Sequence, residues 1–123
     1  MVIDTSALLA MFFNEARGSK VAEIMEANAA DLRMSTVNLA ETLILLEDRQ
    51  PQCFENIRKE ILESSIRFVA PSIQQAQLAA KARLDYPLNL GDCFAYALAK
   101  VEQDAVLTLD PDFHKTDIEV VKL

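Results

Sequence analysis

Residues 1–13 read MVIDTSALLAMFF, and this stretch sets the pattern for the rest of the chain. Met1-Val2-Ile3 is a short apolar run of the kind that forms a buried strand. Asp4-Thr5-Ser6 supplies residues that cap helices, and the apolar run Ala7–Phe13 follows directly. The stretch therefore predicts a strand, a turn and a helix, with Asp4 at the point where the strand ends.

The same alternation of strand and helix continues along the chain. Apolar residues recur at helical spacing from Val37 to Asp48, and Leu90–Glu102 has the alanine-rich, apolar content of a buried helix. Because strands alternating with helices indicate a parallel sheet, we predict a three-layer α/β domain with a central, mainly parallel sheet of four or five strands flanked by helices. The expected strands are Met1–Ile3, Leu32–Met34, Ile66–Val69, Ala105–Leu109 and an edge strand at Ile118–Lys122. The expected helices are Ala7–Phe13, Ser19–Asn28, Val37–Asp48, Phe54–Ser64, a helix capped by Ser72 that runs to about Arg83, Leu90–Glu102, and one turn after Asp110-Pro111.

Length and composition indicate one domain, residues 1–123, because single domains most often have about 100–150 residues. The hydrophobic fraction is 51%, but charges interrupt every apolar run before the ~18 residues that a membrane span needs. Met1-Val2-Ile3 runs into Asp4 without the pattern of a secretory signal, so we expect a soluble, cytoplasmic protein. Cys53 and Cys93 are then expected to be reduced thiols, each packed as a small hydrophobic side chain.

Several classes of function are excluded. The two glycines, Gly18 and Gly91, cannot form the glycine-rich loops of Rossmann and P-loop proteins, and no GxSxG nucleophile elbow occurs. The net charge of −7 argues against broad electrostatic attachment to nucleic acid, which depends on Lys and Arg that neutralise phosphates. Any chemistry on nucleic acid is therefore expected to be local and assisted by metal ions.

Four acidic residues are predicted at one edge of the sheet. Asp4 directly follows the first strand, and Asp110 directly follows the strand Ala105–Leu109. Glu41 and Asp92 lie near the starts of helices that could project toward the same edge. Because ligands bind beyond the carboxyl ends of the strands in open parallel sheets, we expect these four side chains to converge there.

Helix capping is an alternative explanation for the three aspartates. Asp4 could cap the first helix, and Asp110 followed by Pro111 is a good helix start. Asp92 lies three residues after Asn89, close to the spacing of a capping box, and the helix dipole favours a carboxylate there. Taken alone, Asp92 is better explained by capping, whereas capping and a functional role are about equally good explanations for Asp110.

Glu41 is harder to explain in this way. At about 100° per residue it falls between Val37, Ile44 and Leu45 on the apolar side of its helix, and no Lys or Arg lies one turn away. A carboxylate buried there would be costly, or would have a raised pKa, unless a cation lies nearby. Repulsion among converging acids likewise calls for divalent ions, and oxygen ligands favour Mg²⁺ or Mn²⁺ over zinc.

Further polar side chains could assist at this edge, although each has a simpler structural explanation. His114, the only histidine, lies in the polar segment Asp112–Asp117, which favours a surface position over a role as general base. Hydroxyl groups near the expected cleft could hold water or a phosphate, and arginines could meet substrate phosphates. These candidates are Thr5, Ser6, Ser35 and Thr36 for the hydroxyls, and Arg33 and Arg83 for the cations.

Four segments, in order along the whole chain, resemble the motifs of PIN domains, the fold of VapC-type toxin ribonucleases. The opening VIDTSAL (2–8) resembles the family's hydrophobic-Asp-Thr/Ser-Ser-Ala start, and STVNLAE (35–41) is similar to its serine-to-glutamate segment. LGDCFAYALA (90–99) resembles the central aspartate helix, and LTLDPDF (107–113) the terminal acidic turn. The ordered set spans nearly the entire chain and implies a PIN-like fold.

The resemblance implies that Asp4, Glu41 and Asp92 hold one or two Mg²⁺ or Mn²⁺ ions together with a fourth acid from the last motif. Asp110 and Asp112 both fit that motif, and Asp110 is preferred because it comes first after the strand. Possible supporting residues are Asp112, Thr5, Ser6 and Thr108.

The implied activity is endonucleolytic hydrolysis of RNA by the toxin of a type II toxin-antitoxin system, which leaves 5′-phosphate and 3′-hydroxyl ends. The implied partners are an RNA substrate, a small cognate antitoxin whose segment fills the acidic groove, and a second copy in a homodimer. One alternative is a metal-dependent phosphatase of another α/β fold, although Asp4 is followed two residues on by Ser6 and not by a second aspartate. The other is a PIN-like RNA-binding scaffold without catalysis, in which the acids only cap helices.

Overall fold

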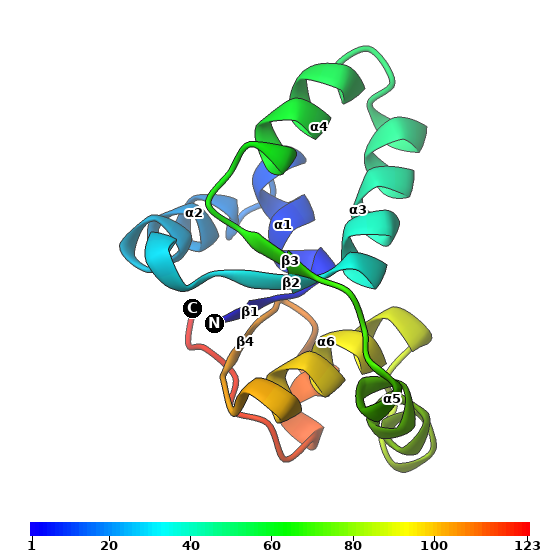
Figure 1. The fold of residues 1–123 in the computed structure, drawn as a ribbon. Helices are drawn as coiled ribbons and strands as arrows, with labels where there is room; N and C mark the ends of the chain where they lie inside the picture. The colour runs from blue at the N-terminus through cyan, green and yellow to red at the C-terminus, as the bar shows by residue number, and fades with distance from the viewer.

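A parallel sheet between two layers of helices makes up the computed structural model, which describes residues 1–123 (Figure 1). The sheet has four strands in the order β3-β2-β1-β4, all parallel. The strands are β1 (Val2–Ile3), β2 (Arg33–Ser35), β3 (Arg67–Val69) and β4 (Val106–Leu107). The helices are α1 (Thr5–Phe12), α2 (Gly18–Ala27), α3 (Thr36–Arg49), α4 (Phe54–Leu62), α5 (Ile73–Asp85) and α6 (Leu90–Glu102), with short 3-10 turns η1 (Ala29–Asp31) and η2 (Pro111–Lys115). The predicted fold class is confirmed.

The two faces of the sheet carry separate hydrophobic cores of 12 buried residues each. Helices α1 to α4 cover one face, and α5 and α6 cover the other (Figure 1). Alternate side chains of a strand point to opposite faces, so Val2 packs in the core under α6 while Ile3 packs in the core under α1. This burial on both sides explains why β1 and β4 are wholly apolar.

The strand order reverses its direction at the pair formed by β1 and β4. From β1 the chain proceeds outward through β2 and β3, then crosses back so that β4 pairs with the other side of β1. Ile3 and Leu107 are partners in this pairing, and therefore Asp4 and Thr108 leave the sheet side by side. Such a reversal in an open parallel sheet opens a crevice where ligands bind.

The last predicted strand is wrong. Over Ile118–Lys122 the structure has a single parallel bridge, between Val106 and Val120, and no extended ladder. Ile118 and Val120 pack against one hydrophobic core, whereas Val121 and Leu123 pack against the other. The segment therefore lies beside β4, held by this packing and by two backbone hydrogen bonds with Val106, but it is too short and irregular to be a strand.

Smaller differences have local causes. The predicted strand Ala105–Leu109 is only Val106–Leu107, because the amide of Leu109 donates to a side chain and not to a neighbouring strand. Cys93 is buried as predicted, but Cys53 is exposed in the turn before α4, so its predicted packing is wrong. The predicted bounds of Leu90–Glu102 and the capping role of Ser72 are confirmed. None of the helices has the length and apolar content to cross a membrane.

Candidate active site

Asp4 lies at the carboxyl end of β1 and is 1% exposed. It occupies the N-cap position of α1, but its side chain makes no capping hydrogen bond, so the capping explanation for Asp4 is wrong. Instead its Oδ2 accepts two hydrogen bonds of 2.8 Å, one from the Ser6 hydroxyl and one from the Thr108 hydroxyl. Residues at the ends of β1 and β4 thus fix the orientation of this carboxylate.

Two backbone amides orient the Ser6 and Thr108 hydroxyls so that both donate to Asp4. The amide of Leu109 donates to Ser6 Oγ at 2.9 Å, and the amide of Asp110 donates to Thr108 Oγ1 at 3.0 Å. Each hydroxyl has one proton to give, and both are directed to Asp4, so the 3.1 Å contact between the two hydroxyl oxygens needs no proton of its own. Ser6 and Thr108 are therefore brought to the site as predicted, as donors that orient a carboxylate.

The other oxygen of Asp4 has no partner. Oδ1 is fully buried and accepts no hydrogen bond from the protein. Burial raises the pKa of Asp4 above its ordinary value, against the opposing effect of the Ser6 and Thr108 hydrogen bonds. A buried, unpaired carboxylate oxygen is costly, and binding a cation would relieve that cost.

Asp92 has both a capping role and a perturbed ionisation. Its amide donates to Asn89 Oδ1 at 2.8 Å, and its own Oδ2 accepts from the Asn89 amide at 3.3 Å, so the predicted capping box is present. Burial, and then the charges of Asp4 and Asp110, raise the pKa of Asp92 to about 7. The three carboxylates are therefore neighbours that repel one another.

The structure brings Asp110, and not Asp112, into this group. The charge of Asp110 contributes to the raised pKa of Asp92. Asp110 also starts η2, since its Oδ1 accepts from the amide of Asp112 at 2.9 Å, so its capping explanation is correct as well. The carboxylate of Asp112 forms an ion pair of 3.1 Å with Lys115.

Glu41 is half-buried, and the prediction that it lies on a buried apolar helix face is wrong. The buried side chains of α3 are Asn38, Thr42 and Leu46, which are spaced four residues apart and therefore lie on one face of the helix, away from Ile44. The apolar side chains around Glu41 line an open groove of about 400 Å³, which Leu90 and Gly91 of α6 complete. The groove is formed by Val37, Ala40, Glu41, Ile44, Leu45, Leu90 and Gly91.

Gly91 makes room for the carboxylate of Glu41. A Cβ atom placed on Gly91 would lie 2.7 Å from Glu41 Oε2 and 2.9 Å from Oε1, closer than atoms approach in proteins. Glu41 therefore sits over the first turn of α6, beside the residue that precedes Asp92. The four predicted acids thus border one region, with Asp4, Asp92 and Asp110 closely coupled and Glu41 across Gly91.

Asn38 is a site residue that the sequence reasoning missed. This fully buried side chain donates through Nδ2 to the carbonyl of Gly91 at 3.0 Å and to Thr5 Oγ1 at 3.3 Å. The Thr5 hydroxyl in turn donates to the backbone carbonyl of Asn38 at 3.3 Å. Asn38 thus joins α1, α3 and α6 behind the acids. The available signal was the spacing of Ser35, Asn38 and Thr42, which forms a polar stripe on a helix.

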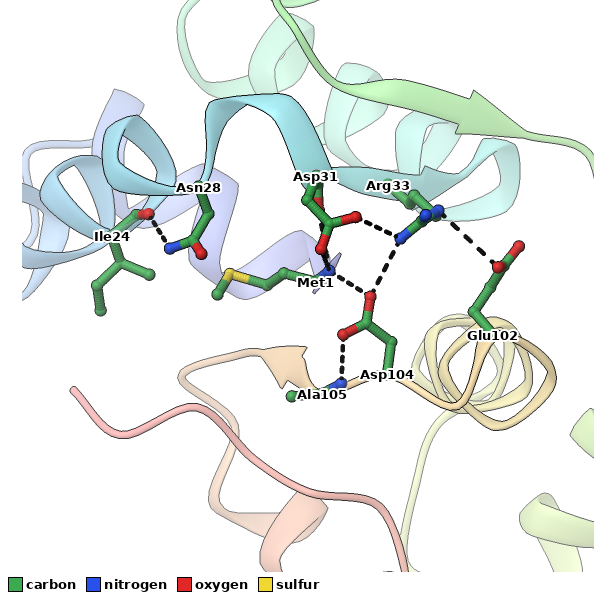
Figure 2. Close-up of polar contacts among 8 residues, drawn as sticks. All are labelled: Met1, Ile24, Asn28, Asp31, Arg33, Glu102, Asp104 and Ala105. Atoms are coloured by element: carbon green, nitrogen blue, oxygen red, sulfur yellow. Dashed lines mark hydrogen bonds and ion pairs between the residues drawn. The ribbon is translucent and has the colours of Figure 1, made fainter.

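The remaining candidates have structural roles, lie at the other end of the strands, or are exposed. Ser35 caps α3 by accepting from the amide of Val37. Arg33 lies at the amino ends of the strands, where it pairs with Asp31 at 3.0 Å and Asp104 at 3.2 Å (Figure 2), so its suggested contact with phosphates at this site is wrong. His114 is exposed, as predicted.

Whether these donors fit a divalent cation depends on both their spacing and their chemistry. No three acidic, cysteine or histidine side chains stand close enough together to enclose a metal ion as the structure has them. The partnerless Oδ1 of Asp4 and the mutual repulsion that raises the pKa of Asp92 nonetheless both call for positive charge at this place. Carboxylate oxygens suit Mg²⁺ or Mn²⁺, so the residues fit such an ion if their side chains close around it.

Comparisons with known proteins point to a single family. The sequence profile described as "PIN domain" matches residues 1–119. The chain is 36% identical, over an alignment of 132 residues, to ribonuclease VapC30 of Mycobacterium tuberculosis, with 100% of this chain and 99% of that protein covered. It is 38% identical over 133 residues to ribonuclease VapC of Mycolicibacterium smegmatis, with 98% and 99% covered.

Solved structures show the same fold at low sequence identity. The crystal structure of Mycobacterium tuberculosis VapC20, described as a Sarcin-Ricin loop cleaving toxin, superimposes with a TM-score of 0.83 at 17% identity, over 99% of this chain and 98% of that one. DNA-bound VapBC from Salmonella typhimurium gives a TM-score of 0.77 at 16% identity, over 98% and 95%. The predicted resemblance in fold is therefore confirmed.

Proposed function

The chain belongs to the PIN domain family, and from this premise we propose that it is a divalent-metal-dependent endoribonuclease, the toxin of a type II toxin-antitoxin pair. The observation that carries the metal requirement is the buried Oδ1 of Asp4, which no protein group satisfies. It lies in a group of carboxylates whose repulsion raises the pKa of Asp92 to about 7. A hard divalent cation would relieve both costs.

In this proposal Asp4, Asp92 and Asp110 hold the ion, with Glu41 contributing from across Gly91. Mg²⁺ or Mn²⁺, when bound, supplies Lewis acidity at the scissile phosphate and lowers the pKa of the attacking water. The chain's own residues prepare this site. Ser6 and Thr108 hold Oδ2 of Asp4 so that Oδ1 is presented in one direction.

Two further groups complete the proposed mechanism. Asn38 fixes the distance between α3 and the first turn of α6 through the carbonyl of Gly91, and so positions Glu41 relative to Asp92. Glu41 is half-exposed, and we assign to its carboxylate oxygens the proton that the attacking water releases. The substrate is RNA, and the proposal includes action in the cytoplasm, where such a substrate is abundant.

The proposed partners are a cognate antitoxin and a second copy of the chain. An antitoxin segment is assigned to the apolar groove beside Glu41, where Ile44 is 66% exposed and Leu90 is 64% exposed. Contiguous exposed apolar side chains of this kind mark protein-binding surfaces. Ile44→Asp should weaken antitoxin binding at least tenfold in a titration, whereas Ile73→Asp on α5, where Ile73 is 83% exposed, should not.

A cleavage assay tests the activity. Purified protein should cleave single-stranded RNA with Mg²⁺ or Mn²⁺, should be inactive in EDTA, and should release no phosphate from a phosphomonoester. Asp92→Asn is a suitable inactive control, because asparagine can still accept a hydrogen bond at the helix start. Phosphomonoester hydrolysis would favour the phosphatase alternative. Divalent-ion binding without any RNA cleavage would favour a scaffold.

A further inference from the structure

A cavity of about 390 Å³ lies between the end of β4 and the C-terminal segment, and Asp110 of the acidic group is part of its wall. Thr108 and Asp110 line it at the end of β4. Three side chains with N–H donors line it as well, each from a different segment: Arg17 before α2, His114 in η2, and Lys122 near the end of the chain. Apolar side chains of the C-terminal segment complete its wall.

These basic side chains are free of acidic partners. Of the 12 Lys and Arg residues, six form ion pairs with Asp or Glu side chains, and Arg17 and Lys122 are not among them. The six are Lys20, Arg33, Arg58, Lys81, Lys100 and Lys115. A chain of net charge −7 thus leaves unpaired cations together in one cavity next to its acidic site.

We propose that this cavity binds a phosphate group of the RNA strand, next to the phosphate that is cleaved. The inference rests on the proposed function and names where its substrate is held. Asp110 connects the cavity to the acidic site. It lines the cavity, and its charge contributes to the raised pKa of Asp92. A strand whose scissile phosphate lies at the acids therefore has its neighbouring phosphate within the reach of the cavity.

The donors in the cavity suit a phosphate. Arg17 offers the planar fork that binds phosphate oxygens in pairs, and Lys122 offers a mobile point charge. They also address the main electrostatic obstacle to the proposed function, since a protein of net charge −7 repels a polyanion in general. A local group of cations would bind the RNA strand at one place, while the rest of the acidic surface continues to repel RNA.

The test is RNA binding by an Arg17→Ala, Lys122→Ala double variant, measured by fluorescence anisotropy with a labelled single-stranded oligoribonucleotide of mixed sequence. EDTA prevents cleavage, and a series of KCl concentrations gives the salt dependence. The Kd should rise on the order of tenfold, and the slope of log K against log salt should fall by about 0.7 for each phosphate contact removed. Lys20→Ala is the matched control, because Lys20 is exposed near Arg17 but pairs with Glu23.

Cleavage kinetics provide a second readout. With Mg²⁺ the double variant should raise KM by a similar factor and leave kcat nearly unchanged, and Arg17→Lys should retain part of the affinity. If the double variant has the same Kd, salt slope and KM as Lys20→Ala, and the parent protein cleaves RNA, the phosphate-binding proposal is wrong and the proposed function is not. A parent protein that binds no RNA in EDTA would overturn the phosphate-binding proposal as well. If the double variant changes the salt slope but the parent protein cleaves no RNA, the cavity binds phosphate and the proposed ribonuclease activity is wrong.

Discussion

The hydroxyl of Thr108 donates a 2.8 Å hydrogen bond to Oδ2 of Asp4, and so joins the carboxyl ends of β1 and β4. Ser6 donates to the same oxygen, and the amides of Leu109 and Asp110 fix the direction of both hydroxyls. One carboxylate oxygen is therefore fully engaged, and the other is buried without a partner.

Thr108→Val should separate orientation from folding. Valine keeps the shape but removes a donor to Asp4 and the acceptor of the Asp110 amide, so the pKa of Asp4 should rise further. We expect RNA cleavage to fall roughly tenfold or more, with the acidic limb of the pH-rate profile moved to higher pH. The unfolding free energy should fall by about 1–3 kcal/mol, as for a buried polar group that loses its partner.

Thr42→Val is the matched control for this change. The Thr42 hydroxyl is also buried, but it donates at 2.8 Å to the carbonyl of Asn38 and not to an acid. Thr42→Val should therefore affect stability without moving the pH-rate profile. An equal shift in both variants would mean that the profile reports general loosening of the site and not the ionisation of Asp4.

Gly91→Ala should reduce activity without reducing stability. Alanine favours the helix by up to about 1 kcal/mol relative to glycine, so the melting temperature should hold or rise. The new Cβ would lie 2.7 Å from Glu41 Oε2, so the carboxylate must move and RNA cleavage should drop about tenfold. In a Glu41→Ala background the same change should have little additional effect on cleavage, since coupled residues are not additive.

Gly18→Ala is the comparison for Gly91→Ala, because the added Cβ would meet backbone and not a side chain. A Cβ on Gly18 would lie 2.3 Å from the backbone oxygen of Ala10, which cannot rotate away. Gly18→Ala is therefore expected to lower the melting temperature where Gly91→Ala does not. Equal losses of stability at the two positions would show that the Glu41 carboxylate is held rigidly, contrary to its half-exposed position.

Asp92 should make the metal-free protein less stable as the pH rises. Its pKa is about 7 in the folded state and near its ordinary value of 3.8 when unfolded. Between these values the folded protein keeps a proton that the unfolded chain has released, so the unfolding free energy should fall from about pH 4 to about pH 7. The raised pKa of Asp4 acts in the same direction.

Denaturant titrations in EDTA over this pH range provide the check. Asp92→Asn should flatten the decline, because asparagine does not titrate, and Mg²⁺ should flatten it in the parent protein, because a cation favours the ionised carboxylates. A stability that rises between pH 4 and pH 7, or a decline that is unaltered in Asp92→Asn, would contradict the coupling among Asp4, Asp92 and Asp110.

Local patterns in the sequence predicted the layered fold and the aspartates because those features are encoded by neighbours in the chain. Met1-Val2-Ile3 followed by Asp4 already contains a buried strand and its carboxyl end, and Asn89 with Asp92 contains a helix start. The order β3-β2-β1-β4, which places Thr108 beside Asp4, depends on pairing between strands about a hundred residues apart. Periodicity within a segment carries no information on that pairing.

The errors concern which face of an element is covered. The apolar stripe of α3 was expected to be buried, whereas Asn38 and Thr42 are buried and Ile44 is 66% exposed. Amphipathic patterns identify the apolar face but do not distinguish a core from a surface left for a partner. Asn38 could not be predicted from the pattern of its own helix, because its role depends on hydrogen bonds to Thr5 of α1 and Gly91 of α6.

Asp4→Asn offers the sharpest test of the proposed site. The structure removes one objection, because Asp4 makes no capping bond that asparagine would have to replace. The amide oxygen of asparagine can accept from both Ser6 and Thr108, and the NH₂ group then takes the place of the partnerless Oδ1. The variant therefore changes the atom that lacks a partner and little else. Loss of a buried negative charge next to Asp92 should leave the metal-free protein as stable or more so, and should lower the pKa of Asp92.

Activity should respond in the opposite direction to stability. If Oδ1 of Asp4 holds a divalent cation, Asp4→Asn should lose at least about 10²-fold in RNA cleavage, the scale for removing a group that stabilises transition-state charge. Calorimetry should show weaker Mg²⁺ or Mn²⁺ binding, and the increase in melting temperature with metal should shrink. Asn38→Ala, which should lower both stability and activity through helix positioning, provides the contrasting pattern. Cleavage at the parent rate by folded Asp4→Asn protein, at saturating and again at limiting Mg²⁺, would remove Asp4 from the metal site, because an amide cannot replace the charge of a metal-binding carboxylate without loss of activity.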